Sequence, residues 1–554
     1  MQNTPFTNLN RRNTLEKLAT QNFDLVVIGG GITGAGIALD ASSRGLKVCL
    51  IEKNDFASGT SSKSTKLIHG GLRYLKQFDF WLVKEVGSER AIVHKLAPHL
   101  VLPEKMLLPL IENGSYGKWL TSIGLKVYDI LAQVTGDDKR RMLEKKEALK
   151  LEPLLPKKIL NGAGYYAEYR TDDARLTLEN IKTSLQYGVI PINYVAVEDF
   201  VYVNDKISGV KVKDSITNTD FEIRGKHVIS ATGPWADELR SLNNSKKGKR
   251  LHLTKGVHLV FPYEKLPVKQ SVYFDIPDGR MMFAIPRGKI TYVGTTDTNY
   301  AEDKNHVKTD LADAMYLISA VNNMFPSIDL NMDDIISSWA GLRPLIHEEG
   351  KSASELSRKD EIFTSDTGLI SIAGGKLTGY RKMAERVVDK VVKLIEDEED
   401  IELKKCYTDK IPLCGNDFKK FKHVKKYIEE ISSRLLPEGF ETYDAWYLVT
   451  NYGKQTETIL ETYAQLNDAD KKVRLAKAEL KFGINFEMVQ TPMDFFIRRT
   501  GRLYFDIDSI RYLLEPILAE FKAIFKLEDT QILAYKTEIE QEIEEHSNFS
   551  LDRV

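Results

Sequence analysis

The chain has 554 residues, of which 42% are hydrophobic and 28% are charged, the composition of an ordinary globular protein. Its length exceeds what one hydrophobic core supports, so we expect roughly two or three domains. The 78 Lys and Arg residues balance 79 Asp and Glu residues to a net charge of −1, which excludes a globally basic, nucleic-acid-binding protein. The three cysteines, Cys49, Cys406 and Cys414, are too few for a disulfide framework or a zinc site, so we expect a reducing cytosol and no metal.

The first 22 residues are polar and lack the apolar core of a signal peptide, so the sequence predicts a cytoplasmic protein. Within them, residues 11–21 are predicted to form a short amphipathic helix. The longest uncharged stretch, residues 25–39, is too short and too rich in glycine to span a membrane. Any membrane contact is therefore expected to be peripheral.

An apolar run over residues 23–28 breaks into glycines, and this pattern predicts a strand, a tight turn and the start of a helix. Gly29 permits the turn, Gly31 lets the backbone approach a pyrophosphate, and Gly34 lets the helix pack against the strand. The phosphates would then meet backbone N–H groups at the positive end of the helix. The segment therefore predicts a dinucleotide site.

A second apolar strand, residues 46–51, ends in Glu52, about where an acidic residue would reach a ribose 2′-OH. A carboxylate there would repel the extra phosphate of NADP, so FAD and NAD stay open. The alternative is a surface glutamate at a strand end. The loop that follows, residues 57–66, is rich in small hydroxyl residues and lysines, which suits either phosphate and flavin contacts or a flexible loop.

The periodicity then alternates between helix and strand. Helical spacing predicts helices over residues 78–97 and 116–131. Alternation between residues 189 and 230 predicts a three-stranded meander, and more strands follow within 251–298. Residues 369–378 repeat the strand, glycine and helix-start design, with a helix running to about Glu396. The N-terminus of that helix can stabilise negative charge at the pyrimidine edge of a flavin.

Beyond an acidic run at residues 396–400, charged amphipathic helices predict a separate helical C-terminal domain. Its most basic segment is residues 418–426. Such a segment is either a solvated face or a site for an anionic membrane or partner.

Together these motifs resemble the FAD-dependent glycerol-3-phosphate dehydrogenases and the closely similar glycerophosphate oxidases. The dinucleotide motif is shared by many flavoproteins, whereas the His-Gly-Gly-Leu-Arg-Tyr and Gly-Gly-Lys-Leu-Thr elements are far more particular. The matching segments lie in the family's order over roughly residues 23–395, and they are residues 27–36, 65–75, 172–176, 231–235, 293–297, 341–345 and 374–378.

The resemblance implies an α/β multidomain fold with three parts. These are an FAD-binding Rossmann-like domain of the glutathione reductase/D-amino acid oxidase type, an antiparallel-sheet substrate domain and a helical C-terminal domain. The expected boundaries are 1–22 for an N-terminal extension; 23–100, 165–240 and 335–395 for the FAD-binding domain; 101–164 and 241–334 for the substrate domain; and 396–554 for the helical domain.

The resemblance also implies the reaction, in which FAD takes a hydride as sn-glycerol 3-phosphate is oxidised to dihydroxyacetone phosphate. In the family the electrons then pass to membrane quinone, or to dioxygen in the oxidases. The oxidases carry an insertion in the substrate-facing region for which this chain has no obvious room, and this favours the dehydrogenase. We further expect a homodimer in peripheral contact with the cytoplasmic face of an anionic inner or plasma membrane, and no nucleic acid.

Oxidation of a secondary alcohol needs a base for the hydroxyl proton and positive charge for the developing alkoxide. By resemblance, His258 is the expected base, and histidine titrates near working pH. Arg343 is expected beside the substrate oxygen and flavin N5, and the proline after it holds its backbone extended. Lys376 serves flavin or substrate. The phosphate is expected on Arg73, Tyr74 and Arg358, since forked guanidinium donors match phosphate oxygens.

The remaining predicted site residues contact FAD, with Gly233 beside the adenosine and the His69 loop over the isoalloxazine. His69 has either a backbone-fixing or a catalytic role. The predicted FAD contacts are Gly29, Gly31, Ile32, Thr33, Gly34, Glu52, Lys53, Thr60, Ser61, Ser62, Lys66, Leu67, His69, Gly70, Gly71, Val197, Ala231, Thr232, Gly233, Trp235, Gly375, Lys376, Leu377 and Thr378.

Two other functions stay open. A flavin amine or amino-acid oxidase of the same broad fold would bind a substrate carboxylate with the same arginines. A dinucleotide-binding interaction protein without turnover would use the helical tail for docking. An NAD-linked hydride transferase is disfavoured, because the second glycine–helix element and the hydroxyl-rich loop suit one extended FAD.

Overall fold

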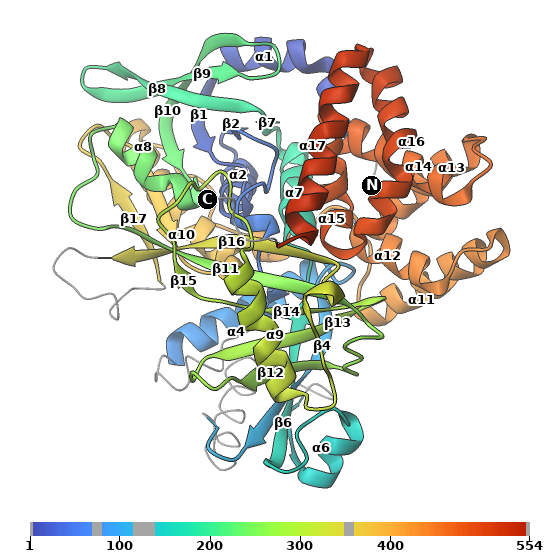
Figure 1. Ribbon diagram of the computed structural model, residues 1–554. Coiled ribbons are helices and arrows are strands. Elements are labelled where there is room, and N and C mark those ends of the chain that lie inside the picture. Colours follow the sequence, from blue (N-terminus) through green and yellow to red (C-terminus); the bar gives the residue numbers. More distant parts are fainter. Residues whose placement is uncertain (1–3, 69–79, 115–138, 348–358, 550–554) are drawn as a thin grey trace.

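The computed structural model describes residues 4–68, 80–114, 139–347 and 359–549. These residues form two β-sheets and a helical C-terminal region, with helices around both sheets (Figure 1). The helix predicted over residues 11–21 is α1 (Arg11–Thr20), and the one predicted over 78–97 is α4 (Phe80–Leu96). The helix predicted over 116–131 lies outside the described residues.

The first sheet has a parallel core in the order β18-β10-β1-β2-β7, with β17 antiparallel at one edge. The predicted meander is confirmed as β8, β9 and β10, which pair antiparallel. The strands of the first sheet are β1 (Asn22–Ile28), β2 (Val48–Ile51), β7 (Ile190–Ile192), β8 (Val195–Val203), β9 (Lys206–Asp214), β10 (Thr219–Ser230), β17 (Asp360–Thr364) and β18 (Ile370–Gly374).

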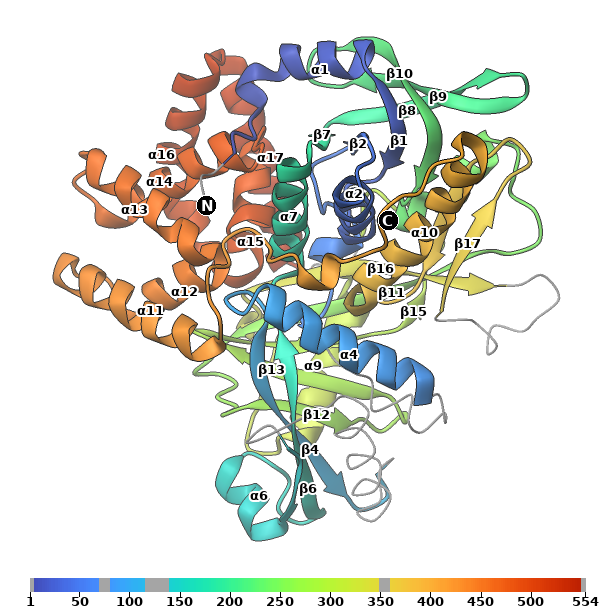
Figure 2. The same cartoon turned by 180° about the vertical axis from the view of Figure 1, so that it is seen from behind.

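Both faces of β1 are buried, which explains why the strand reads as a continuous apolar run. Leu25 and Val27 pack with helices α2 (Ile32–Ser43) and α10 (Tyr380–Glu399). Val26 and Ile28 pack with the meander on the opposite face. Helix α7 (Asp173–Ser184) lies against α2 on the side away from α10 (Figure 2). The chain therefore makes the β1–α2–β2 crossover that a dinucleotide fold requires.

The second sheet is mostly antiparallel, in the order β15-β11-β14-β13-β12-β4-β6-β3, with β16 on β11 and β5 on β6. Helix α9 (Leu311–Met324) packs on it (Figure 1). The strands are β3 (Leu67–Ile68), β4 (Leu102–Ile111), β5 (Arg141–Glu144), β6 (Leu160–Arg170), β11 (Arg250–Pro262), β12 (Ser271–Asp275), β13 (Met281–Arg287), β14 (Ile290–Gly294), β15 (Thr298–Asn299) and β16 (Ser337–His347).

Strand β6 pairs with β4 and strand β16 pairs with β11, so both belong to the second sheet. Most of their residues nevertheless fall in ranges assigned above to the FAD-binding domain. The domain boundaries stay a prediction. Two short helices flank the sheets, α6 (Lys145–Leu151) and α8 (Ala236–Leu242).

The C-terminal region is helical, as predicted, and it shares a hydrophobic core with the second sheet. Trp339 of β16 and Tyr292 of β14 pack in the same cluster as Phe496, Tyr504 and Phe521. Among the described residues, no helix combines the length and apolar character needed to cross a bilayer. The helices are α11 (Phe421–Leu435), α12 (Thr442–Tyr452), α13 (Thr456–Gln465), α14 (Lys471–Phe486), a π-helix (Asp494–Arg499), α15 (Arg502–Phe505), α16 (Ile507–Phe525) and α17 (Asp529–Ser547).

Candidate active site

The glycine turn between β1 and α2 has the geometry that the motif predicts. Gly29 has φ +108°, and a Cβ there would lie 2.6 Å from the carbonyl oxygen of Ala231 on β10. A Cβ on Gly34 would lie 1.9 Å from the carbonyl oxygen of Gly29, so only glycine lets α2 pack this closely. Gly31 caps α2 without a side chain, and a Cβ there would lie 3.1 Å from Ser61 Oγ. The turn therefore leaves a narrow backbone cradle at a helix N-terminus.

This cradle lines a cavity of about 350 Å³, hereafter the dinucleotide cavity. Most of the predicted FAD contacts line it, which places them together in space. They are Gly29, Gly31, Ile32, Thr33, Glu52, Lys53, Thr60, Ser61, Val197, Ala231, Thr232, Gly233, Trp235, Gly375, Lys376 and Leu377. Their contact with FAD stays a prediction.

Glu52 lines the dinucleotide cavity and also fixes the glycine turn. Its Oε2 accepts a hydrogen bond from the Gly30 amide at 2.7 Å, and its Oε1 accepts one from the Asn54 amide at 2.9 Å. Burial raises the pKa of this carboxyl, and the two amides oppose that rise. Beside it, Lys53 Nζ lies 4.3 Å above the Trp235 ring.

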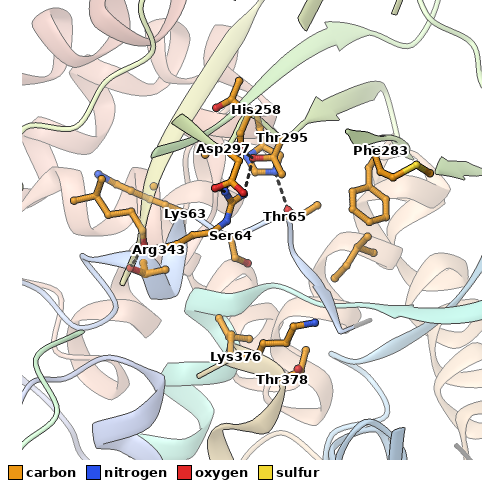
Figure 3. Close-up of a pocket in the computed structure, with 18 of the residues that line it drawn as sticks. Lys63, Ser64, Thr65, His258, Phe283, Thr295, Asp297, Arg343, Lys376 and Thr378 are labelled. Atoms are coloured by element: carbon orange, nitrogen blue, oxygen red, sulfur yellow. Dashed lines mark hydrogen bonds and ion pairs between the residues drawn. The ribbon is translucent and has the colours of Figure 1, made fainter. Parts of the chain in front are cut away.

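A second cavity of about 310 Å³, hereafter the substrate cavity, adjoins the first. The two cavities share the wall residues Thr60, Pro344, Gly375, Lys376 and Leu377, so they lie directly against each other. Figure 3 shows His258, Thr295 and Asp297 on one side of it and Lys376 and Thr378 on the other. A dinucleotide bound at the glycine turn would therefore lie beside a chamber lined by titratable side chains.

His258 is buried in the wall of the substrate cavity and its ring is held on one edge only. Its Nε2 lies 2.9 Å from Thr65 Oγ1, and the ring stacks on Trp339 at 4.7 Å and 11°. Among the described residues, none forms a hydrogen bond with its Nδ1. Burial, with the charges of Arg343 and Lys66, lowers the pKa of His258 well below 6.5, so the imidazole is neutral at pH 7.

Arg343 reaches the same cavity from β16 and is held by the segment after β14. Its Nη2 donates to Thr295 Oγ1 at 2.8 Å, and its Nη1 donates to the Thr296 carbonyl at 3.0 Å and to Asp297 Oδ1 at 3.1 Å. A Cβ on Gly256 of β11 would lie 2.5 Å from Arg343 Nη2, so this glycine makes room for the guanidinium. The arginine and His258 are thus fixed on neighbouring strands.

Several predicted site residues lie elsewhere in the structure. Lys66 is buried, and its Nζ donates to Asp173 Oδ1 at 2.5 Å and to the Ser62 carbonyl at 3.0 Å. Lys66, Ser62 and Gly34 are not among the residues that line either cavity, whereas Leu67 and Thr378 line the substrate cavity. His69, Gly70, Gly71, Arg73, Tyr74 and Arg358 lie outside the described residues.

Some residues of the site were missed by the sequence analysis. Thr65, Thr295 and Asp297 stand in quoted motifs, but nothing in the motifs shows that they hold His258 and Arg343. Arg280 also lines the substrate cavity, and no motif marks it. Conversely, Arg175 of the 172–176 motif is buried away from both cavities, where it pairs with Glu487 at 2.7 Å.

Comparison with known proteins assigns the chain to a family. Residues 24–381 match the family described as FAD dependent oxidoreductase, and residues 406–532 match the C-terminal domain of alpha-glycerophosphate oxidase. The aerobic glycerol-3-phosphate dehydrogenase of Bacillus subtilis is 49% identical over 521 residues, which cover 94% of each chain. The chain belongs to the aerobic glycerol-3-phosphate dehydrogenase family.

Other members agree with this assignment. The aerobic glycerol-3-phosphate dehydrogenase of Staphylococcus aureus is 47% identical over 543 residues, which cover 97% of this chain and 98% of the relative. The structure of the glycerol-3-phosphate dehydrogenase of Bacillus halodurans, solved with FAD, has a TM-score of 0.84 and 40% identity and covers 99% of this chain and 100% of that chain. The predicted family, fold class and FAD-dependent oxidoreductase class are confirmed.

Proposed function

We propose that this chain oxidises sn-glycerol 3-phosphate to dihydroxyacetone phosphate and passes the electrons to quinone. The observation that carries the proposal is the buried His258, which lines a cavity that adjoins the dinucleotide cavity and whose Nδ1 forms no hydrogen bond with any described residue. FAD, when bound, supplies the hydride acceptor at N5. The names of the relatives supply the substrate class.

His258 suits the role of base. When Nε2 donates its proton to Thr65 Oγ1, the other nitrogen, Nδ1, carries the lone pair that can accept a hydroxyl proton. The stack on Trp339 holds the imidazole plane in place. A bound phosphate would offset the nearby charges of Arg343 and Lys66, which raises the basicity of the imidazole when substrate is present.

Arg343 and Lys376 suit the stabilisation of charge on the reacting oxygen. They line the substrate cavity, and positive groups fixed before reaction lower the free energy of a developing alkoxide. Arg73, Tyr74 and Arg358 are proposed to bind the phosphate, as the resemblance implies. The backbone amides at Gly31 to Thr33 are proposed to bind the cofactor pyrophosphate.

The decisive experiment is anaerobic reduction of the FAD-loaded protein, followed by the loss of flavin absorbance. Bleaching by glycerol 3-phosphate and not by glycine, proline or alanine is expected. Bleaching by an amino acid would instead show an amino-acid oxidase, and no bleaching by any of them would show a binding protein without turnover. Stopped-flow reoxidation by dioxygen and by a soluble quinone then identifies the acceptor, and fast reoxidation by dioxygen alone would make the enzyme an oxidase.

We also propose peripheral contact with the cytoplasmic face of an anionic membrane, where quinone is available, and a homodimer. Exposed lysines on and before α11 support the first, among them Lys419, Lys422, Lys425 and Lys426. Co-sedimentation with vesicles of anionic lipids, but not with neutral ones, is the expected result. The homodimer is tested by light scattering, which should give the mass of two chains.

A further inference from the structure

Arg280 lies in the turn between β12 and β13, at the side of the substrate cavity contributed by this hairpin. It lines the cavity together with His258, Arg343 and Asp297. The turn is compact: the Ile276 amide donates to the Arg280 carbonyl at 3.0 Å, and Gly279 has φ +82°. The arginine is therefore presented from a tight hairpin turn rather than from a long loop.

Its guanidinium is fixed on one edge. Nε and Nη2 both donate to Asp278 Oδ2, at 2.8 and 2.6 Å. The same oxygen accepts a hydrogen bond from Tyr316 of α9 at 2.9 Å, and the guanidinium carbon lies 4.6 Å from the centroid of the Tyr316 ring. Two side chains thus orient Arg280, so little rotamer entropy is lost when it binds a ligand.

The other edge is available. No described residue accepts a hydrogen bond from Arg280 Nη1, and the side chain is 39% exposed. The nearby Asp297 carboxylate lies toward Arg343, to which it is paired at 3.1 Å. The hairpin therefore places a permanent cation in the wall of the cavity that we assign to the substrate, with N–H donors that no described residue occupies.

We propose that Arg280 binds the phosphate end of the substrate at the cavity wall and sets the affinity of the enzyme for phosphate monoesters. This inference rests on the proposed function. A guanidinium with free N–H donors matches phosphate oxygens, and a dianion gains about twice the Coulomb energy of a monocarboxylate at the same distance. Arg280 therefore favours a phosphorylated alcohol over an amino acid in a fold that accommodates both.

The test compares Arg280→Met and Arg280→Lys with the control Arg511→Met. Arg511 is 54% exposed on α16 and pairs with Asp508 at 2.7 Å, so the control removes the same charge from a similar local ion pair outside both cavities. Arg280→Met should raise KM for glycerol 3-phosphate about tenfold with kcat within about twofold, and Arg280→Lys should recover part of the loss. Arg511→Met should keep both constants.

The Kd of inorganic phosphate, measured from the perturbed flavin spectrum, provides a second readout that needs no turnover. It should weaken about tenfold in Arg280→Met and stay unchanged in the control. An unchanged KM and phosphate Kd in Arg280→Met, an equal rise in both variants, or a loss of kcat alone would overturn the proposal. If wild-type protein is not bleached by glycerol 3-phosphate, the proposed function fails, and the phosphate Kd alone then decides the role of Arg280.

Discussion

Replacement of Arg499 by alanine should destabilise the protein and loosen the loop that lines the dinucleotide cavity. Arg499 ends the π-helix of the C-terminal region and is buried. Its Nη1 and Nη2 donate to Asp55 at 2.7 and 2.9 Å, and its Nε and Nη2 donate to the Glu487 carbonyl. Asp55 belongs to the loop after β2 that carries Glu52 and Ser61.

The size of the effect follows from the burial of this pair. Loss of one partner of a buried ion pair costs about 3–5 kcal/mol. Arg498 and Asn193 still contact Asp55, so the lower limit, about 3 kcal/mol, applies. Burial raises the pKa of Asp55, but the charges of Arg499 and Arg498 outweigh it and hold the pKa at about 2.

Urea unfolding at fixed excess FAD measures the loss, with the exposed Arg511→Ala as the control. Because the pKa of Asp55 is lowered on folding, its stabilisation is complete above about pH 4 and is lost as the pH falls toward about 2. In Arg499→Ala the free energy of unfolding should fall less steeply between about pH 4 and pH 2 than in the wild-type protein. The variant should also lose FAD faster on dilution. A loss under about 1 kcal/mol at pH 7, with an unchanged acid limb, would refute the reasoning.

Three further outcomes are expected. Gly34→Ala should yield protein without flavin absorbance, because the new methyl group would lie 1.9 Å from the Gly29 carbonyl oxygen. The control Gly379→Ala, whose methyl group would have no atom within 4 Å, should stay yellow. His258→Asn and Arg343→Ala should lower turnover by about 10²-fold or more in yellow protein, and unchanged turnover in both would remove the proposed mechanism. The pKa of His258 in the free protein lies well below 6.5, so kcat/KM, corrected for titration of the substrate phosphate, should stay flat as the pH falls from 7 to 6, and a remaining acidic limb centred near 6.5 would contradict the assignment.

Local features of the fold were predictable because they depend on neighbouring residues. The turn at Gly29 to Gly34 needs glycine where a Cβ would strike the chain, and this spacing is visible in sequence. The second glycine turn at Gly374 and Gly375 has the same signature, and both have positive φ. The cavity between these turns follows from the parallel order of β18, β10 and β1.

Residues whose partners are distant could not be assigned from the sequence. Lys66 stands in a hydroxyl-rich loop that predicts phosphate contact, yet its ammonium pairs with Asp173, far along the chain. Arg175 stands in a segment that resembles the family, and nothing in that segment shows that Glu487, 312 positions later, accepts its hydrogen bonds. Such ion pairs leave no local pattern in the sequence. Until the fold is known, the same charged residue can therefore be interpreted either as a ligand-binding group or as a structural group.

The C-terminal region also supports the proposed base, through a continuous aromatic stack. His258 stacks on Trp339, and Trp339 contacts Tyr504 of α15 at 5.3 Å between ring centroids. The Trp339 Nε1 donates to the Ser64 carbonyl at 3.1 Å, next to the Thr65 that holds His258 Nε2. The plane of the imidazole is thus set on one side by a loop of the cofactor site and on the other by an indole that the C-terminal helices hold in place. A proton acceptor must keep its lone pair aimed at the substrate hydroxyl. If His258 is that acceptor, as proposed, the C-terminal helices help to orient it, although α15 supplies no residue to the wall of the substrate cavity.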